Sequence, residues 1–260
     1  MIRALYTSQT GMNAQELQLD VTSNNLANVN TTGFKKSRAQ FEDLIYQNLR
    51  AAGAETVDGG QLPSGIQIGL GTRTTTVQKI FTQGDFSQTN NELDITIEGR
   101  GFFQIVRDGV ELYTRAGAFT KDSDGFIVTQ NGDRLQPEFS IPDDTVILEI
   151  DSSGLISAMD SAQQILGSVQ LTVHTFVNPG GLKATGGNNY LPSEASGDPT
   201  ESNPGSDAAG TLAQGFLELS NVSVTEELVN LIVTQRAFDA NSKGISTADQ
   251  LLETTNNLVR

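Results

Sequence analysis

The sequence predicts an α+β fold in which long N- and C-terminal helices enclose a central all-β domain. Near both termini apolar residues recur at every seventh position, the period that keeps one helix face towards a partner helix. Between the ends the apolar period changes to two, and Gly-containing turns separate the apolar runs. We expect the terminal helices to form a discontinuous coiled coil. The expected segments are an N-terminal coiled-coil helix at 1–33, an extended arm at 34–74, a β-domain at 75–215 and a C-terminal coiled-coil helix at 216–260.

The N-terminal segment predicts a helix from about residue 3 to residue 28, roughly 40 Å long at 1.5 Å per residue. It ends in an Asn-rich run before Gly33, because Asn side chains compete for backbone hydrogen bonds and Gly permits a positive φ. The helix-packing residues predicted here form a stripe with a seven-residue period: Leu5, Met12, Leu19 and Leu26.

The following segment predicts an extended arm. Apolar residues at Phe41, Leu44, Ile45 and Leu49 have partly helical spacing, and residues 51–71 are then rich in Gly and polar side chains. The basic residues that begin the segment are expected to be solvated side chains near a helix end, because isolated charge runs usually lie in water. They are Lys35, Lys36 and Arg38.

The central segment predicts a meander of antiparallel strands. Apolar and polar residues alternate over 93–98 and 169–175, as expected for strands with one buried face. Residues 178–210 are rich in Gly, Pro, Asn, Ser and Glu, and we expect long loops there. Four dipeptides between apolar runs supply the positive φ values of tight turns: Asp108-Gly109, Asp124-Gly125, Asn131-Gly132 and Ser153-Gly154.

The return helix is predicted to begin near Ser223, where Ser223 and Glu226 fit a capping box. From there to Val259 it would be roughly 55 Å long, a length that needs a partner helix. The polar residues Gln235, Ser242, Asp249 and Asn256 leave the apolar stripe narrow, which favours contacts with several helices, including those of neighbouring chains. The helix-packing residues predicted here are Val224, Leu231, Phe238, Ile245, Leu252 and Val259.

Charge and composition exclude several classes of protein. The net charge is −15; the first 30 and last 40 residues carry four basic and seven acidic groups, and the middle carries 12 and 24. Without clustered Lys and Arg, no nucleic-acid partner is expected. The absence of Cys excludes disulfides and thiolate metal sites. No apolar run is long enough for a signal peptide or a membrane span, so we expect neither.

The residues indicate no enzyme, no metal and no cofactor. His174 is the only histidine and lies in a strand pattern, so we expect it to be structural. The run 122–125 shares a fragment with calcium loops but lacks the closing Glu, which favours a hairpin turn. Gly99 and Gly101 are not followed by a third Gly and a helix, so no phosphate site is predicted. Asp143 and Asp144 are adjacent in an expected loop and give no sign of a glycosidase.

Residues 23–35, 89–103 and 220–229 resemble segments of the bacterial flagellar axial proteins of the rod and hook. The N-terminal one is 23–35, and its signature residues are Asn24, Asn25, Leu26, Ala27, Asn28, Gly33 and Phe34. The others are 89–103, at the entry to the β-domain, and 220–229, at the return helix. Within this family, the insert from Tyr46 to Arg73 most resembles the distal rod members, since proximal rod proteins usually lack it and hook proteins are longer.

The resemblance implies a structural subunit of the flagellar basal body that assembles with copies of itself into a rigid, periplasm-spanning rod. It also implies export by the flagellar type III apparatus without a cleaved signal. The implied partners are proximal rod proteins and the hook protein at the two ends, and the peptidoglycan-ring and outer-membrane-ring proteins around the rod. The terminal helices would form the inner tube, the arm would stiffen it, and the acidic β-domain would lie outermost.

Three alternatives remain open at this level. The chain could be another axial protein, of the proximal rod or the hook. It could be a periplasmic adaptor, which also joins a coiled coil to a β-domain, although adaptors usually carry the helical hairpin internally. A carbohydrate-active β-protein is the third, with no pattern in its favour.

Overall fold

The computed structural model describes residues 2–50, 63–206 and 209–258. Internal contacts divide the chain into two compact units, each assembled from segments distant in sequence. The helical unit contains 1–26, 37–78 and 224–260, and the β unit contains 27–36 and 79–223. Helices at both ends and a β-rich middle confirm the predicted α+β class.

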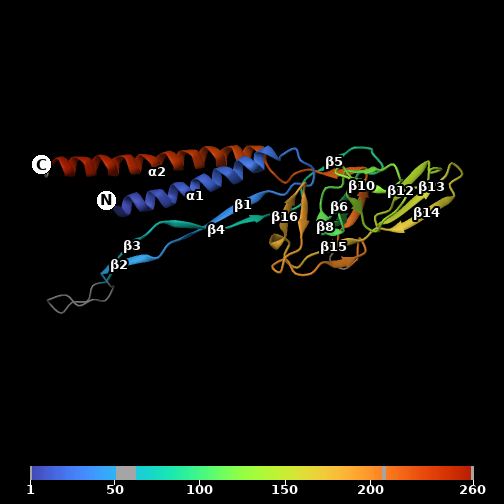
Figure 1. Cartoon of the computed structure of the whole chain (residues 1–260), viewed down its shortest axis with the longest axis horizontal. Helices are drawn as coiled ribbons and strands as arrows, with labels where there is room; N and C mark the ends of the chain where they lie inside the picture. The colour runs from blue at the N-terminus through green and yellow to red at the C-terminus, as the bar shows by residue number, and fades with distance from the viewer. Residues whose placement is uncertain (1, 51–62, 207–208, 259–260) are drawn as a thin grey trace. The chain divides into compact units, whose positions relative to one another are not determined.

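Two helices run through the helical unit. Helix α1 spans Ile2–Ala27 and helix α2 spans Val224–Leu258, within one or two residues of the predicted bounds. They run in opposite directions, so that both chain ends lie at the same end of the pair (Figure 1). Val259, the last predicted stripe residue, lies outside the described residues. Neither helix, over its described length, is long and apolar enough to cross a membrane.

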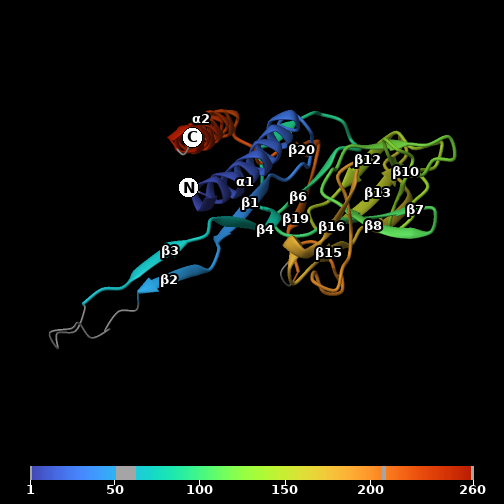
Figure 2. The same ribbon diagram turned by 60° about the vertical axis from the view of Figure 1, so that its left-hand side comes forward.

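The remainder of the helical unit consists of paired strands. Strand β1 (Ser37–Asp43) pairs with β4 (Thr72–Lys79), and β2 (Tyr46–Arg50) pairs antiparallel with β3 (Ile66–Gly69). Figure 2 shows these ribbons following one another away from the helices. The partly helical spacing of the apolar residues in this segment does not correspond to a helix, because Ser37–Asp43 and Tyr46–Arg50 are strands. The backbone N–H and C=O groups of these strands bond to a partner strand more than a dozen residues later in the chain. The local spacing of apolar residues gives no information about such a partner.

The β unit is built of antiparallel sheets. The largest has seven strands in the order β16-β17-β8-β7-β11-β10-β9, and a second consists of β12-β13-β14. Three pairs complete the unit: β15 with β18, β19 with β6, and β20 with β5. The strand bounds are β5 Phe86–Gln88, β6 Ile95–Glu98, β7 Phe103–Arg107, β8 Val110–Thr114, β9 Phe119–Lys121, β10 Ile127–Thr129, β11 Arg134–Leu135, β12 Ile147–Ile150, β13 Leu155–Met159, β14 Ile165–Gln170, β15 Val173–Thr175, β16 Lys183–Gly186, β17 Asn189–Leu191, β18 Thr200–Ser202, β19 Thr211–Gln214 and β20 Phe216–Glu218.

The principal apolar core lies within the β unit and joins strands from several of its sheets. Ile95, Ile97 and Phe103 are among its completely or almost completely buried members. Thr96 is buried as well, so β6 is covered on both faces and its prediction as a half-buried strand is wrong. At the four predicted turns, Gly109, Gly125, Gly132 and Gly154 all have positive φ, as expected.

Two stretches of the β unit differ from the sequence-based expectation. The alternation over 169–175 is split between β14 and β15, which belong to different sheets, and both Leu171 and Val173 are completely buried. Residues 178–210, predicted as loops, contain β16, β17, β18 and the short 3₁₀ helix Pro179–Gly181. Strand β17 forms because Tyr190 enters an aromatic cluster, and long-range burial outweighs the loop-like composition around it.

Candidate assembly surfaces

Glycines allow the two helices to touch. A Cβ atom added at Gly11 would lie 3.0 Å from Nδ2 of Asn241, and one added at Gly244 would lie 3.1 Å from Oγ of Ser8. Contacts therefore pair later residues of α1 with earlier residues of α2, as an antiparallel pair requires. Small residues at such crossings let two helix backbones come closer than larger side chains permit. Gly11 is a contact position that the seven-residue stripes did not include.

The predicted apolar stripes are mostly half-buried in the single chain. Leu5, Met12, Leu19 and Leu26 on α1 are all half-buried, and so are Leu231, Phe238, Ile245 and Leu252 on α2. Val224 is exposed, and the complementary polar positions of α2 are exposed too: Gln235, Ser242, Asp249 and Asn256. The structure of one chain thus leaves each stripe partly open to further contacts.

The most deeply buried helix positions are small or polar. On α1, Ala14, Val21, Thr22 and Asn25 are buried. On α2 the buried positions are Glu227, Thr234 and Ala248. Buried polar groups must be hydrogen-bonded, and they specify alignment more strictly than apolar contacts do.

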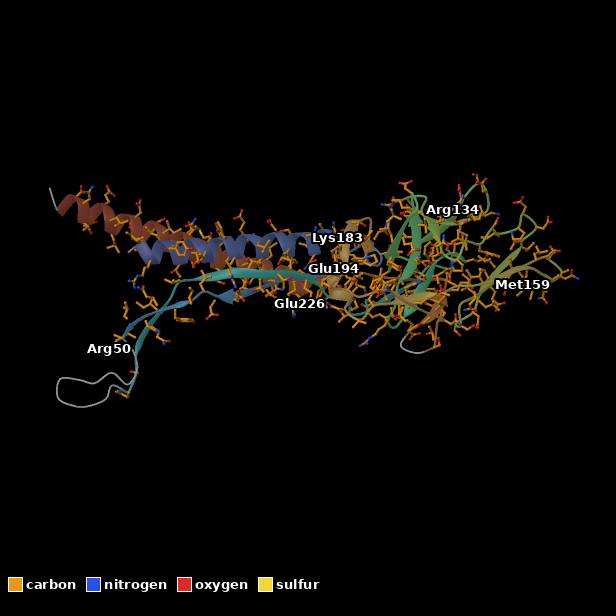
Figure 3. All side chains as sticks on the ribbon, turned by 60° about the horizontal axis from the view of Figure 1, so that its bottom comes forward. Arg50, Arg134, Met159, Lys183, Glu194 and Glu226 are labelled. Atoms are coloured by element: carbon orange, nitrogen blue, oxygen red, sulfur yellow. The ribbon has the colours of Figure 1, made fainter. Side chains whose placement is uncertain are left out.

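An apolar face remains uncovered on the first half of α2. Leu228, Val229, Ile232 and Val233 occupy positions i, i+1, i+4 and i+5, which share one side of a helix, and all four are about half exposed. Figure 3 shows side chains along α2 beyond the labelled Glu226. An exposed apolar patch of this kind is typical of a protein interface.

Asn25, in the predicted signature, holds the chain after it leaves the helix. Its Nδ2 donates to the carbonyl oxygen of Ser37 at 2.8 Å, and its Oδ1 accepts from the backbone N–H of Ser37, also at 2.8 Å. The side-chain amide thus satisfies both backbone groups of Ser37, the first residue of β1. Because Asn25 is buried, this pair fixes the end of α1 beside the start of the arm.

Gly33 and Phe34 shape the signature turn within the β unit. Gly33 has φ +70°, and a Cβ there would lie 2.7 Å from the backbone nitrogen of Ala116. Its N–H donates to the carbonyl oxygen of Glu218 at 2.8 Å. Phe34 is buried, with the ammonium group of Lys79 lying 4.7 Å from its ring centre. At position 33, only glycine fits both the positive φ and the close approach of the Ala116 backbone.

Lys35 forms a buried ionic cluster with Glu218 and Arg115, which corrects the prediction of a solvated side chain. Its Nζ lies 2.6 Å from Oε1 of Glu218 and donates to the carbonyl oxygen of Thr82 at 2.8 Å. The Nε of Arg115 donates to the other carboxylate oxygen of Glu218 at 3.0 Å. No sequence spacing points to this cluster, since Lys35 and Glu218 are separated by 183 positions.

Burial and the neighbouring charges shift the pKa values of Glu218 and Lys35 in this cluster. Burial alone would raise the pKa of Glu218, but the charges of Arg115 and Lys35, with hydrogen bonds from Lys35 and the N–H of Gly84, hold this pKa below its usual value. Burial lowers the pKa of Lys35, although Glu218 opposes that shift. The carboxylate of Glu218 therefore remains charged while buried, because its partners surround it.

His174 and the loop of Gly99 and Gly101 have neighbours within the β unit. His174 is buried in β15 with its ring 5.3 Å from that of Tyr113, and burial lowers its pKa. The carbonyl oxygens of Gly99 and Gly101 accept hydrogen bonds from Arg115. The loop therefore directs hydrogen-bond acceptors towards the guanidinium cation of Arg115. Over residues 2–50, 63–206 and 209–258, no group of three or more His, Asp or Glu is placed to hold a metal ion.

Three family descriptions match consecutive parts of the chain. "Flagella basal body rod protein" matches residues 5–35, "Flagellar hook protein FlgE/F/G D1 domain" matches 96–158, and "Flagellar basal body rod FlgEFG protein C-terminal" matches 213–258. The first and last cover most of α1 and α2, and the middle one lies in the β unit.

Individual relatives match over nearly the whole length. The flagellar basal-body rod protein FlgG of Buchnera aphidicola subsp. Schizaphis graminum is 46% identical over 255 residues, covering 97% of this chain and 98% of that protein. FlgG of Borreliella burgdorferi is 43% identical over 264 residues, covering 100% of both. The flagellar hook protein FlgE of the same organism is 44% identical over 139 residues, but these are 52% of this chain and 31% of the hook protein.

Terminal helices with apolar faces left open, joined to a β unit, define a structural protein of the flagellar axial class. The chain belongs to the flagellar basal-body rod protein family. It is a structural subunit of the flagellar rod: the FlgG rod proteins match it over nearly their full length, whereas the hook protein matches only about half of it.

Proposed function

We propose that this rod subunit assembles with copies of itself through its terminal helices into a rigid helical tube, which transmits torque from the motor to the hook. The observation that carries the proposal is the uncovered apolar face of α2, formed by Leu228, Val229, Ile232 and Val233. Burying it against a neighbouring subunit would remove apolar surface from water, the main driving force of protein association.

The heptad stripes supply the second support. Apart from the exposed Val224, their described residues are half-buried in one chain, and a coiled-coil position becomes fully buried only when helices surround it on more than one side. We infer that the discontinuous coiled coil of α1 and α2 is completed by neighbouring subunits. The same residues then act as assembly residues: Leu5, Met12, Leu19, Leu26, Val224, Leu231, Phe238, Ile245 and Leu252, with Val259 outside the described part of the chain.

The proposal also covers the role of each segment of the chain and the place of the subunit in the distal part of the rod. Segments 1–33 and 216–260 would form the inner tube, 34–74 an arm that stiffens it, and 75–215 the outer domain. In the arm, β2 and β3 form a two-stranded ribbon that exposes Tyr46, Leu49 and Ile66. An isolated two-stranded ribbon is marginally stable in water, so we infer that neighbouring subunits support it.

The proposed setting follows from the family. The subunit would pass through the flagellar type III export apparatus and join the periplasm-spanning rod. Proximal rod proteins and the hook protein would contact the two ends of its stack, and peptidoglycan-ring and outer-membrane-ring proteins would surround it. We propose no enzymatic activity and no nucleic-acid or membrane partner, in keeping with a net charge of −15.

The test is a single substitution on the open face of α2. Ile232→Asp places a charge on a surface that is exposed in the single chain, so the purified variant should melt like the parent protein. In cells that depend on the variant, electron microscopy of basal bodies should show the distal shaft missing and the proximal rod intact. Val110→Asp, at an exposed apolar residue of β8 in the β unit, is the matched control and should leave the shaft present.

Hydrogen exchange gives an independent measurement. A free monomer should exchange its amides quickly over 3–28 and 224–258, because narrow stripes with polar flanks cannot bury themselves alone. Strong protection of both helices in a verified monomer would contradict the proposal that assembly orders them.

A further inference from the structure

We propose that an apolar tip on the β unit of one subunit docks into an aromatic-lined pocket on the β unit of a second copy of this chain. The inference rests on the self-assembly proposed above and adds a contact outside the terminal helices. It assigns a role to two surface features of the β unit that take no part in the proposed contacts of α1 and α2.

The pocket is a cavity of about 560 Å³ within the β unit. Phe81, Phe102 and Phe176 line its wall, and the ring of Phe102 meets the other two edge-to-face at centroid distances of 5.3 and 5.5 Å. Such a cluster is rigid, so the cavity is already formed in the single chain. Its volume lies in the range of sites that accept apolar ligands or side chains.

The rim of the pocket is basic and apolar. Arg100 lines it between Gly99 and Gly101, whose φ values of +116° and +140° set the course of this loop. Within the part of the chain that the structure describes, Arg100 makes no ion pair. Val177, also in the lining, is 90% exposed, which is costly for an apolar side chain with no partner.

The tip is the outer end of the β12-β13-β14 sheet. Ile147 pairs with Met159, and Met159 pairs with Ile165 at a register shift between Ala158 and Met159, so the three residues form one row across the three strands. Ile165 is 64% exposed, and Val146 and Leu166 beside the row are exposed as well. Figure 3 shows the labelled Met159 at the outer end of this sheet.

Charge makes the tip and the rim complementary. Asp144 and Glu149 are exposed beside the apolar row, whereas the pocket rim carries Arg100. Opposite charges around an apolar contact favour one orientation and exclude like-charged partners. The β unit is acidic overall, so an unpaired Arg on its surface would attract an acidic segment of a second copy.

The contact must join different copies. Figure 1 shows the β12-β13-β14 sheet apart from β15, whose Thr175 lines the pocket, and both belong to the same compact unit. A tip and a pocket at different places on one body make a head-to-tail contact, and repeated head-to-tail contacts build helical filaments. This geometry agrees with a subunit that polymerises into a rod.

Cysteine cross-linking in assembled rods tests the contact, because the native chain has no Cys. A chain carrying Ile165→Cys at the tip and Val177→Cys at the pocket should give a ladder of disulfide-linked multimers from isolated basal bodies after mild oxidation. The matched control combines Val177→Cys with Val110→Cys, another exposed apolar position, and should give no ladder. Thermal melting of each purified chain checks folding.

The outcomes separate this contact from the helix-based assembly. Rods that form normally without a tip-to-pocket ladder would overturn the contact and leave the proposed function standing. A ladder as strong in the control pair would overturn it as well. A folded tip or pocket variant that cannot form rods, while Val110→Cys does form them, would support the contact. Arg100→Glu should weaken the ladder several-fold, and adding Asp144→Lys should restore it.

Discussion

The ammonium nitrogen of Lys35 lies 2.6 Å from a carboxylate oxygen of Glu218, and both side chains are buried. Lys35 follows the N-terminal signature, and Glu218 ends β20, just before the chain enters α2. The pair therefore joins the exit of the first helix to the approach of the second, inside the β unit.

Removing the lysine should destabilise the β unit strongly. Lys35→Met leaves Glu218 buried with Arg115 as its only ionic partner, and breaking a buried pair in this way typically costs about 3 kcal/mol or more. Urea unfolding of the full chain measures the change. Lys183→Met, at an exposed lysine of β16, should change stability by less than about 0.5 kcal/mol. Equal effects of the two substitutions would contradict the importance of the ionic cluster.

The stability of the protein should fall in acid partly through Glu218. Its pKa is lower in the folded protein than the value near 4.3 of an unfolded chain. The contribution is therefore fully present above the unfolded pKa and is lost as the pH falls through the folded pKa. The measurement is the urea midpoint between neutral pH and about pH 3.

Glu218→Gln should make that pH dependence shallower, although the variant is less stable at neutral pH. The other carboxylates titrate in both proteins, so the difference between the two profiles isolates Glu218. Parallel profiles would show that this carboxylate does not contribute to acid sensitivity.

Gly33 should tolerate no side chain. Gly33→Ala requires a positive φ, which costs about 1–2 kcal/mol for a residue with a Cβ, and also places that Cβ 2.7 Å from the backbone of Ala116. Gly109→Ala is the matched control, because its φ is +79° and nothing lies within 4 Å of the added atom. Thermal melting should show a clearly larger loss for Gly33→Ala, and equal losses would show that the close approach has no cost.

Asn25 should control the order of the segment between the first helix and β1. Asn25→Ala removes both hydrogen bonds to Ser37, so in assembled rods, where α1 is ordered, the Ser37 amide should exchange with solvent faster. The loss of stability should be about 1–3 kcal/mol, the cost of leaving buried partners unsatisfied. Asn13→Ala, at an exposed position of α1, should leave exchange at Ser37 unchanged. Unchanged exchange in Asn25→Ala would contradict this role.

The terminal helices could be predicted because their signal is local and repeated. Each signal depends on residues that are close together in the sequence. The signals are the stripe from Leu5 to Leu26, the Asn-rich run that ends the first helix, and the glycines of the turns. The same local signal did not reveal the contact of Gly11 with Asn241, which depends on two helices meeting. It also could not show that Lys35 is buried, since its partners come from distant strands.

By itself, the sequence determined the α+β class, the two long helices, the positive-φ turns and the resemblance to the rod and hook proteins. These features depend on periodicity, turn chemistry and motifs that are read along the chain. Only the tertiary structure decided that 178–210 contains strands, that the arm is a paired ribbon, and that Lys35, Arg115 and Glu218 share one buried site. The physical reason is that strand pairing and ion pairing join residues far apart in sequence, whose partners no local pattern specifies.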